Sequence, residues 1–292
     1  MLVKFAVIGG NASKDLAKRI ARRLKAPYIE TQAKIFPDGE SKITFGRIPK
    51  KSIVVVVQST YPPVDTNLLQ ALSIISQAKK ASSKIYAIIP YMGYARQDKQ
   101  FLSGEVITMS VVAKMIQIAG ATKVVFVDIH SKTALNHFKI RTENVSAIPE
   151  LAKYFKKMKL KNPLVVSPDM GGSLRAKKFA SLLNTDFIAL KKSRNRKTGK
   201  VQIQSSKVDV NGRDLIVIDD MISTGGSVVK ATQFLKRQKC KRVFVACTHG
   251  LFVGDAERKI KNAGVSQIIS TNTIPSSTSK VDVSGVIAKS IQ

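Results

Sequence analysis

Tryptophan is absent from this chain of 292 residues, aromatic residues make up 6% of it, and it has only two cysteines, Cys240 and Cys247. So few cysteines exclude a disulfide-dense secreted scaffold and a four-thiolate zinc site. Both lie in or beside the apolar run CKRVFVAC, where we expect small buried side chains. No apolar run approaches the roughly 20 residues of a membrane span, and the opening MLVKFAVIGG is too short and too soon charged for a signal peptide. We therefore expect a cytoplasmic protein with no membrane attachment.

Acidic residues are also scarce, because 19 Asp and Glu stand against 49 Lys and Arg, which gives a formal net charge of +30. Such an excess predicts attraction to polyanions: nucleic acids, acidic membranes or phosphorylated substrates. The basic residues are spread along the whole chain and form no separable tail, and few aromatic residues accompany them. We therefore expect a solvated basic surface and no specific nucleic-acid partner.

Short β-branched apolar runs alternate with amphipathic stretches along the chain, a pattern typical of parallel sheets that helices cover on both faces. The predicted strands are 3–8, 53–57, 84–90, 123–128, 163–167, 186–190, 214–219, 242–248 and 266–270. The predicted helices are 12–25, 65–80, 106–119, 172–184, 226–238, 254–263 and a short last one, 284–290. The fold class is therefore α/β, with doubly wound parallel sheets.

Two stretches share one plan, and the chain has room for two domains. The runs that begin at Ser52 and at Asp214 each read as an apolar strand, a small polar loop and an amphipathic helix. We therefore expect two similar domains, 1–145 and 146–274, joined by a polar linker within 141–150. The last helix has no evident preference for either domain, and we assign 275–292 to the first.

The strongest functional signal is VIDDMISTGGSV, where Asp219 and Asp220 end a buried strand. Glycines let a backbone approach an anion closely, and the N–H groups at a helix start point toward it. The neighbouring carboxylates suit ribose hydroxyls or a divalent metal. The loop residues that we expect at a sugar phosphate are Ser223, Thr224, Gly225, Gly226 and Ser227. The alternative is a capped helix after a tight turn, with both acids facing solvent.

Other polar residues also follow strands or lie in turns, and each has an ordinary structural interpretation beside the functional one. The segment FPDGE exposes an aromatic ring and two carboxylates, as a hairpin turn also does. Arg96 and Gln97 follow the strand 84–90, where they can hold a phosphate and a base or simply form a solvated loop. His130 and Asp169 each follow a strand and can bind a metal, although a lone histidine is more often structural and Asp169 can cap a helix. His249 stays a weak candidate.

In this order and spacing, FPDGE, YARQD, DIHS, SPDMGG, DDMISTGG and THGLF resemble ribose-phosphate diphosphokinase (PRPP synthetase), and DIHS resembles its archaeal type. The resemblance covers essentially the whole chain and implies two domains of the type I phosphoribosyltransferase fold. It also implies transfer of the β,γ-diphosphoryl group of MgATP to the C1 hydroxyl of ribose 5-phosphate, which yields PRPP and AMP.

The resemblance further implies roles for individual residues. For ATP it implies Phe36 stacked on the base, with Asp38, Gly39 and Glu40 contributed by a neighbouring subunit, and Arg96 and Gln97 from the same subunit. For Mg²⁺ it implies His130 and Asp169. For ribose 5-phosphate it implies Asp219 and Asp220 at the hydroxyls, with Ser223, Thr224, Gly225, Gly226 and Ser227 at the phosphate. A shared ATP site implies a homo-oligomer, at least a dimer.

The catalytic cations are expected in the loop KKSRNRKTGK, where six of the ten residues 191–200 are basic. The family pattern Lys-x-Arg matches Lys192 and Arg194, and Arg194 would also contact ribose 5-phosphate; Lys191 is the substitute if the register shifts by one. The sequence departs from the family at Lys200, where an acid is common, and at Ser223, where many relatives carry Asp. A solvated basic hairpin is the plain alternative.

Three other functions compete with the synthetase. A phosphoribosyltransferase that consumes PRPP would share DDMISTGG but would need neither FPDGE nor RQD. A non-catalytic regulatory homologue would be expected to lose the basic loop or the metal ligands, and this chain keeps both. A nucleic-acid-binding protein would account for the charge, but no nucleic-acid motif is present.

Overall fold

The structure, a computed structural model, describes residues 4–194, 201–204 and 209–292, without the side chains of 192–194 and 201–204. It divides into two compact units. Unit 1 comprises Met1–Ser146, Asn272–Pro275 and Asp282–Gln292, and unit 2 comprises Ala147–Thr271 and Ser276–Val281. Among the helices in the described ranges, none is both long and apolar enough to cross a membrane.

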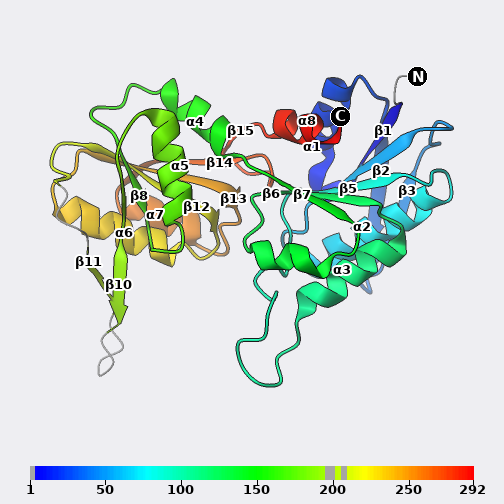
Figure 1. The fold of residues 1–292 in the computed structure, drawn as a ribbon, viewed down its shortest axis with the longest axis horizontal. Helices are drawn as coiled ribbons and strands as arrows, with labels where there is room; N and C mark the ends of the chain where they lie inside the picture. Colours follow the sequence, from blue (N-terminus) through cyan, green and yellow to red (C-terminus); the bar gives the residue numbers. More distant parts are fainter. Residues whose placement is uncertain (1–3, 195–200, 205–208) are drawn as a thin grey trace. The chain divides into compact units, whose positions relative to one another are not determined.

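Unit 1 is built on a seven-stranded sheet (Figure 1). Its strand order is β3-β2-β1-β4-β5-β6-β7, and only the edge strand β3 is antiparallel to its neighbour. Its strands are β1 (Phe5–Gly9), β2 (Tyr28–Ile35), β3 (Ser41–Phe45), β4 (Ile53–Val57), β5 (Ile85–Ile89), β6 (Lys123–Val127) and β7 (Arg141–Val145). Its helices are α1 (Lys14–Leu24), α2 (Val64–Lys79), α3 (Thr108–Ala119) and α8 (Ser284–Ile291), with 3-10 turns at Asn11–Ser13 and Lys132–His137.

Unit 2 carries a six-stranded parallel sheet in the order β15-β14-β13-β12-β8-β9, together with a separate antiparallel hairpin, β10-β11. Its strands are β8 (Leu164–Ser167), β9 (Phe187–Ala189), β10 (Lys191–Arg194), β11 (Val201–Gln204), β12 (Asp214–Ile222), β13 (Arg242–Gly250), β14 (Val265–Thr271) and β15 (Ser279–Val281). Its helices are α4 (Ile148–Lys156), α5 (Ser173–Leu183), α6 (Gly226–Arg237) and α7 (Ala256–Asn262).

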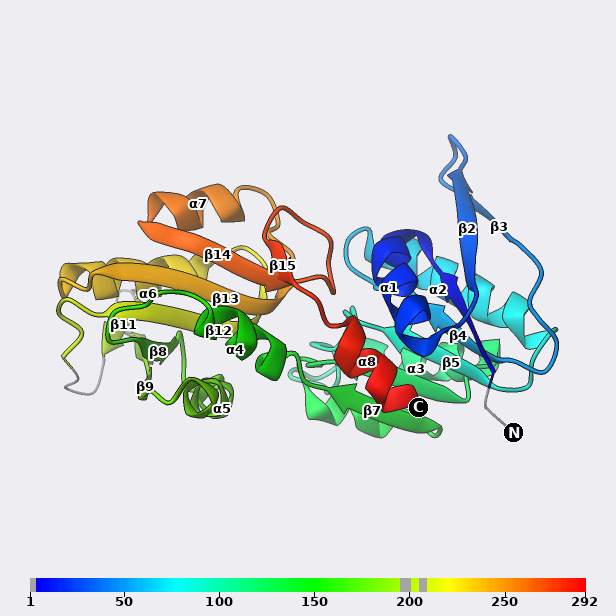
Figure 2. The same cartoon turned by 90° about the horizontal axis from the view of Figure 1, so that it is seen from above.

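Helices cover both faces of the sheet in unit 2, which confirms the doubly wound α/β class. Val217 lies on the face that packs with Val228 of α6 and Ile260 of α7. Ile216 lies on the opposite face, in the cluster that contains Phe155 of α4 and Phe179 of α5. Figure 2 shows α7 and α5 on opposite sides of this sheet. Both faces of the central strands are thus buried, so these strands read as continuous apolar runs and not as alternating ones.

The two sheets share one strand order, which explains the shared plan in the sequence. Five strands of each unit take corresponding places in its sheet. In chain order, these strands are β1, β2, β4, β5 and β6 in unit 1 and β8, β9, β12, β13 and β14 in unit 2. The pair β4–α2 therefore corresponds to β12–α6, the two stretches that the sequence pattern matched. The residues toward the carboxyl ends of the two strands differ, because β12 carries Asp219 and Asp220 near its end whereas β4 leads into Gln58 and Ser59.

Side chains of unit 1 fill the position that follows β4. Gln58 is 1% exposed and Ser59 is 0% exposed. Gln58 Oε1 accepts a hydrogen bond from Ala12 N at 3.1 Å, and Ser59 N donates to Ser13 Oγ at 2.9 Å. A Cβ added at Gly10 would lie only 2.1 Å from Gln58 Oε1, so the amide occupies the space directly beside the backbone. This end of β4 is a packed part of the interior.

The structure differs from the sequence-based prediction at a linker, at a strand that was missed and at the end of another strand. The predicted linker 141–150 is the strand β7 followed by the start of α4. β7 escaped detection because it is an edge strand whose residues are half-buried or exposed, so it lacks an apolar run. The polar strand β2 was missed for a similar reason. β12 continues past Asp219 to Ile222, because Met221 and Ile222 still pair with His249 and Gly250 of β13.

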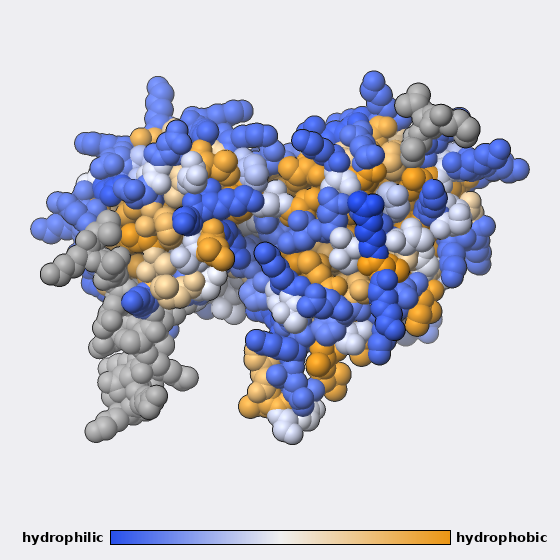
Figure 3. Space-filling view, in the orientation of Figure 1, coloured by the Kyte–Doolittle hydropathy of each residue, from blue (hydrophilic) through white to orange (hydrophobic). Residues whose placement is uncertain are grey.

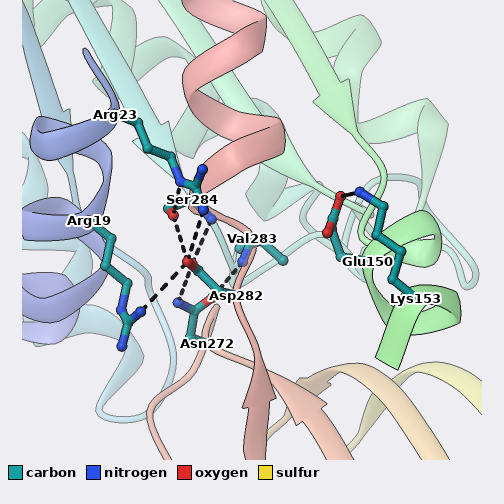
Figure 4. Close-up of polar contacts among 8 residues, drawn as sticks. All are labelled: Arg19, Arg23, Glu150, Lys153, Asn272, Asp282, Val283 and Ser284. Atoms are coloured by element: carbon teal, nitrogen blue, oxygen red, sulfur yellow. Dashed lines mark hydrogen bonds and ion pairs between the residues drawn. The ribbon is translucent and has the colours of Figure 1, made fainter. Parts of the chain in front are cut away.

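A cluster of polar contacts around Asp282 fastens the last segment of the chain to unit 1 (Figure 4). The Asp282 carboxylate accepts hydrogen bonds from Asn272 Nδ2 at 2.9 Å, from the Ser284 hydroxyl at 2.9 Å and from Ser284 N at 2.9 Å. Arg19 and Arg23 of α1 lie 3.7 and 3.4 Å from the same carboxylate. Burial raises the pKa of Asp282, but these hydrogen bonds and the charge of Arg19 outweigh it and hold the pKa below its usual value.

Hydrophilic side chains cover much of the surface that Figure 3 shows, as the composition predicts. A contrasting area is the loop between β5 and α3, where Phe101, Leu102 and Val106 are 60%, 70% and 68% exposed. On α3 itself, Val111, Met115 and Ile118 are also exposed.

Candidate active site

The carboxyl end of β12 and the start of α6 form an open anion cradle in unit 2. Gly225 caps α6 with a φ of 75°, and this glycine cap supplies no side-chain hydrogen bond to the helix start. A Cβ at Gly225 would lie 3.0 Å from Ile260 Cδ1, whereas a Cβ at Gly226 would have no described atom within 4 Å. The backbone therefore turns sharply at Gly225 and leaves room beside Gly226. The amides of this first turn suit a phosphate group.

The two acids of the loop share one cation, Arg175 of α5. Arg175 Nη1 lies 3.0 Å from Asp219 Oδ1, and Nη2 lies 3.5 Å from Asp220 Oδ1. Asp220 N also donates to Asp219 Oδ1 at 2.9 Å, so the two acids are tied to each other. The Asp220 side chain is 4% exposed and that of Asp219 20% exposed. The two carboxylates therefore share one partner and are linked to each other. The alternative interpretation of this motif, in which both acids face solvent, does not describe them.

Asp219 holds its proton to an unusually high pH. Burial raises its pKa from 3.8 to about 7, and the charge of Asp220 adds to this shift, while Arg175 opposes it. Cys247 faces Asp219 from β13 and is fully buried, as the apolar run predicted. Burial raises the pKa of its thiol, and the two acids raise it further. The thiol is therefore a neutral packing group beside the acids.

Asp169 lies in the loop after β8, where local hydrogen bonds hold it. Its Oδ1 accepts from Gly172 N at 3.2 Å, and its carbonyl oxygen accepts from Ser167 Oγ at 2.6 Å. A Cβ at Gly172 would lie 2.6 Å from Ser167 Oγ and 3.3 Å from Arg175 Nη1. Asp219 and Asp220 therefore lie at Arg175, while Asp169 belongs to the loop after the neighbouring strand, whose Gly172 lies close to the guanidinium.

The predicted catalytic pair falls on the hairpin β10-β11. Lys192 pairs with Ile203 and Arg194 with Val201 in the antiparallel register, so the backbone has the form of a basic hairpin. The side chains of Lys192 and Arg194 lie outside the described part of the chain, as does residue 200.

In unit 1, FPDGE forms the turn of the hairpin β2-β3. Gly39 N donates to Phe36 O at 2.9 Å, and Phe36 N donates to Glu40 O at 2.8 Å. Gly39 has a φ of 92° and Asp38 Oδ1 accepts from Glu40 N at 3.1 Å, so local hydrogen bonds set the turn. Asp38 and Glu40 are exposed, and Lys34 Nζ lies 5.1 Å from the centre of the half-buried Phe36 ring. The turn thus presents one aromatic ring and two carboxylates to solvent.

Arg96 and Gln97 lie in the loop after β5, and both are exposed. Their neighbour Asp98 is 4% exposed, and its Oδ2 finds no hydrogen-bond partner among the described residues. His137 Nε2 contacts Asp98 O at 2.8 Å, which ties this loop to the segment after β6. His137 is therefore a structural contact.

His130 follows β6 and is exposed, whereas His249 on β13 is 1% exposed. Ligands in solvent can reach the first imidazole but not the second, which removes His249 from the candidates. The predicted metal ligands His130 and Asp169 belong to different units. Across the described ranges, no three His, Cys, Asp or Glu side chains form a metal-binding group. Mg²⁺ is often bound by one or two protein carboxylates and completes its coordination with water and substrate phosphates. A site with few protein ligands therefore suits an Mg²⁺ ion that is already bound to a nucleotide.

Comparisons with known proteins agree with this arrangement. The family model for the N-terminal domain of ribose phosphate pyrophosphokinase matches residues 5–120, and the model for the phosphoribosyl synthetase-associated domain matches residues 190–292. The ribose-phosphate pyrophosphokinase of Sulfurisphaera tokodaii is 36% identical over 290 residues, which cover 98% of this chain and 99% of that protein. The protein of the same name from Sulfolobus acidocaldarius is 37% identical over 293 residues, with 98% and 99% covered.

A solved structure extends the agreement to three dimensions. The phosphoribosylpyrophosphate synthetase from Mycobacterium smegmatis matches with a TM-score of 0.87 at 29% identity, over 99% of this chain and 97% of that one. Two similar doubly wound domains of the type I phosphoribosyltransferase fold are thereby confirmed. The identity over nearly the whole length, together with both family models, shows that the chain belongs to the ribose-phosphate pyrophosphokinase family.

Proposed function

We propose that this protein is a ribose-phosphate diphosphokinase, which transfers the β,γ-diphosphoryl group of MgATP to the C1 hydroxyl of ribose 5-phosphate and releases AMP. The observation that carries the proposal is the pair Asp219 and Asp220 beside the glycine-capped start of α6, in a chain of this family. One end of this loop offers acceptors for sugar hydroxyls, and the other offers backbone donors for a phosphate.

For ribose 5-phosphate, we assign Asp219 and Asp220 to the ring hydroxyls and residues 223–227 to the phosphate. The support is chemical, because carboxyl oxygens accept hydrogen bonds and sugar hydroxyls can donate them. The space beside Gly226 and the exposed or half-buried hydroxyls of Ser223, Thr224 and Ser227 suit the phosphate. Substrate hydroxyls would compensate the desolvation that raises the pKa of Asp219.

For ATP, we assign Phe36, Asp38, Gly39 and Glu40 to the adenine, and Arg96 and Gln97 to the nucleotide. The exposed turn of β2-β3 offers a ring for stacking and carboxylates that accept from an amino group. We further assign the turn to a neighbouring subunit's ATP, which makes the protein a homo-oligomer, at least a dimer. The cytoplasmic location stays a prediction of the sequence.

Mg²⁺ belongs to the proposal as the partner of the nucleotide phosphates, with His130 and Asp169 as protein ligands. Bound there, the ion would neutralise charge on the transferred group. The Asp169 carboxylate is partly exposed, and the hydrogen bond from Gly172 N at 3.2 Å fixes its orientation.

In the transfer itself, the oxygen of the C1 hydroxyl bonds to the β-phosphorus, and the bond between that phosphorus and the oxygen of the α-phosphate breaks. The hydroxyl proton is released, and AMP leaves. Negative charge spreads over the oxygens in line with the β-phosphorus, so positioned cations are the main contribution that a protein can make. We assign this contribution to Lys192 and Arg194 of the basic hairpin, with Arg194 also at the sugar phosphate.

The test is AMP release from MgATP with and without ribose 5-phosphate. Wild-type protein should release AMP only when the sugar phosphate is present. Lys192→Ala should lower kcat by about 100- to 1,000-fold, the loss that follows removal of one transition-state donor. Lys178→Ala, on the exposed side of α5, is the matched control and should keep wild-type rates.

Lys191→Ala tests the register of the Lys-x-Arg pair. A large loss in Lys191→Ala with a small one in Lys192→Ala would move the assignment by one residue and leave the reaction intact. Absence of AMP from wild-type protein that binds ribose 5-phosphate would contradict the proposed function, and would favour a PRPP-consuming transferase or a regulatory homologue.

A further inference from the structure

Arg175 is a cation that the sequence did not single out, although it contacts both acids of the candidate site. It lies in the first turn of α5 and its side chain is 23% exposed. Its Nη1 lies 3.0 Å from Asp219 Oδ1 and its Nη2 3.5 Å from Asp220 Oδ1. One planar guanidinium therefore faces two consecutive carboxylates, each with a different nitrogen.

The two carboxylates begin on opposite faces of the sheet. Ile216 and Ile218 pack into the cluster of α4 and α5, whereas Leu215 and Val217 pack into the cluster of α6 and α7. Because side chains alternate along a strand, Asp220 starts on the face of α5 and Asp219 on the other. A single cation reaches both only at the carboxyl edge of the sheet. Arg175 lies at the point where the two carboxylates converge.

The same side chain also lies close to Gly172, the N-cap of α5. A Cβ at Gly172 would lie 3.3 Å from Arg175 Nη1, so little space is left between this glycine and the guanidinium. Asp169 Oδ1 holds Gly172 N at 3.2 Å. The start of α5 thus lies beside both the loop after β8 and the two acids of β12.

We propose that Arg175 is a positioning residue, whose guanidinium holds Asp219 and Asp220 in the arrangement that accepts the 2- and 3-hydroxyls of ribose 5-phosphate. This inference rests on the proposed function, because it takes that sugar phosphate as the ligand of the acids. Without the guanidinium, two adjacent carboxylates repel each other, and one of them, Asp220, is nearly buried. The acids then separate, and they lose the geometry that recognises two neighbouring hydroxyls.

The experiment compares ribose 5-phosphate with 2-deoxyribose 5-phosphate in wild-type protein, Arg175→Met and Arg175→Lys, with Lys178→Met as the matched control on α5. Arg175→Met should raise the KM for ribose 5-phosphate by about 10- to 100-fold, the usual cost of losing a partner that orients a ligand-binding group. The KM for ATP should stay within about twofold. Arg175→Lys should recover part of the loss, because an ammonium group can pair with one carboxylate at a time.

The preference for the 2-hydroxyl distinguishes a positioning role of Arg175 from a role that only stabilises the fold. Wild-type protein should prefer ribose 5-phosphate by about tenfold or more, and this ratio should fall toward one in Arg175→Met. A variant that weakens both sugar phosphates equally, with the ratio unchanged, would overturn the inference. If Arg175→Met does not fold, the preference for ribose 5-phosphate is measured with Arg175→Lys and Arg175→Gln instead. Thermal unfolding shows which variants are folded.

Failure of the inference and failure of the proposed function give different results. If wild-type protein and Lys178→Met release no AMP with ribose 5-phosphate, the proposed function fails, whatever Arg175 does. If both are active and Arg175→Met keeps its preference for the 2-hydroxyl, only the role of Arg175 is rejected.

Discussion

At the scale of the residue, the two adjacent glycines of the TGG loop have different roles. Gly225 adopts a φ of 75° and packs against Ile260, whereas Gly226 faces open space. Gly225→Ala should therefore lower the free energy of unfolding by about 1–2 kcal/mol, because an L side chain is strained in this conformation and meets Ile260.

Gly226→Ala is the matched comparison and should change that free energy by less than about 0.5 kcal/mol. Its effect should instead fall on the ligand, with a rise of about tenfold in the KM for ribose 5-phosphate, because a methyl group fills the cradle. Urea unfolding and steady-state kinetics of both variants check the contrast. Equal losses of stability would show that Gly226 also has a structural role.

The raised pKa of Asp219 predicts that the free energy of unfolding depends on pH. Because this pKa rises from 3.8 to about 7 on folding, the folded state binds the proton more tightly, and stability falls as pH rises through that range. Asp219→Asn should therefore raise the free energy of unfolding at pH 8 by about 1 kcal/mol or more, and much less at pH 4. It should also weaken ribose 5-phosphate binding.

Urea unfolding at the two pH values measures this difference, with the exposed Asp186→Asn as control. A stability gain that is the same at both pH values would contradict the titration of Asp219 as its cause.

Individual residues of the site were predictable where the motif itself is unusual. Asp219, Asp220 and the TGG loop stand out because paired acids and glycines at a strand end are uncommon by chance. Arg175 does not stand out, because it is one of 49 cations and only the fold shows which acids it meets. The positive-φ Gly225 was visible as a glycine, but its contact with Ile260 of α7 depends on tertiary packing.

At the scale of the element, the carboxylate of Asp282 holds the start of the last helix, α8, in place. Asp282 accepts hydrogen bonds from Asn272 and Ser284, and it lies beside two arginines of α1. Asp282→Ala should lower the free energy of unfolding by about 1–3 kcal/mol, because several donors lose a partly buried acceptor. Glu150→Ala removes the surface pair with Lys153 (Figure 4) and should cost less than about 0.5 kcal/mol.

The direction of the Asp282 pKa adds a second check. A carboxyl whose pKa is lowered on folding stabilises the protein above its unfolded pKa, and this contribution disappears as pH falls through the folded value. The difference between wild-type protein and Asp282→Ala should therefore shrink below about pH 4. A difference that persists in acid would assign the effect to packing instead of charge.

Elements were predictable in proportion to their burial. The central strands β4, β6 and β8 are almost entirely buried and appear in the sequence as uninterrupted apolar runs. β2 and β7 expose many of their residues, so their sequences resemble loops. The extension of β12 to Ile222 comes from pairing with β13, which the local sequence does not encode.

At the scale of the whole molecule, the charge of +30 predicts strong salt dependence. Both substrates are anions, and the screening length shortens from about 10 Å at 0.1 M salt to about 3 Å at 1 M. The KM values for ATP and ribose 5-phosphate should rise several-fold over this range, while thermal unfolding in the same buffers reports any change in stability. Constant KM values would show that the net charge does not assist binding.

The shared topology of the two sheets has a consequence for how this protein can vary. In unit 2, β12 carries Asp219, whose pKa is raised by burial, whereas in unit 1 the corresponding strand β4 leads into the neutral amide of Gln58, whose oxygen accepts a hydrogen bond from Ala12 N. The same place in the strand plan is therefore packed interior in unit 1, and in unit 2 it holds the acids that we propose for the sugar hydroxyls. A substitution that stabilises the fold at Asp219 has to be weighed against the proposed role of this residue at the substrate, whereas Gln58 has no such role in the proposal.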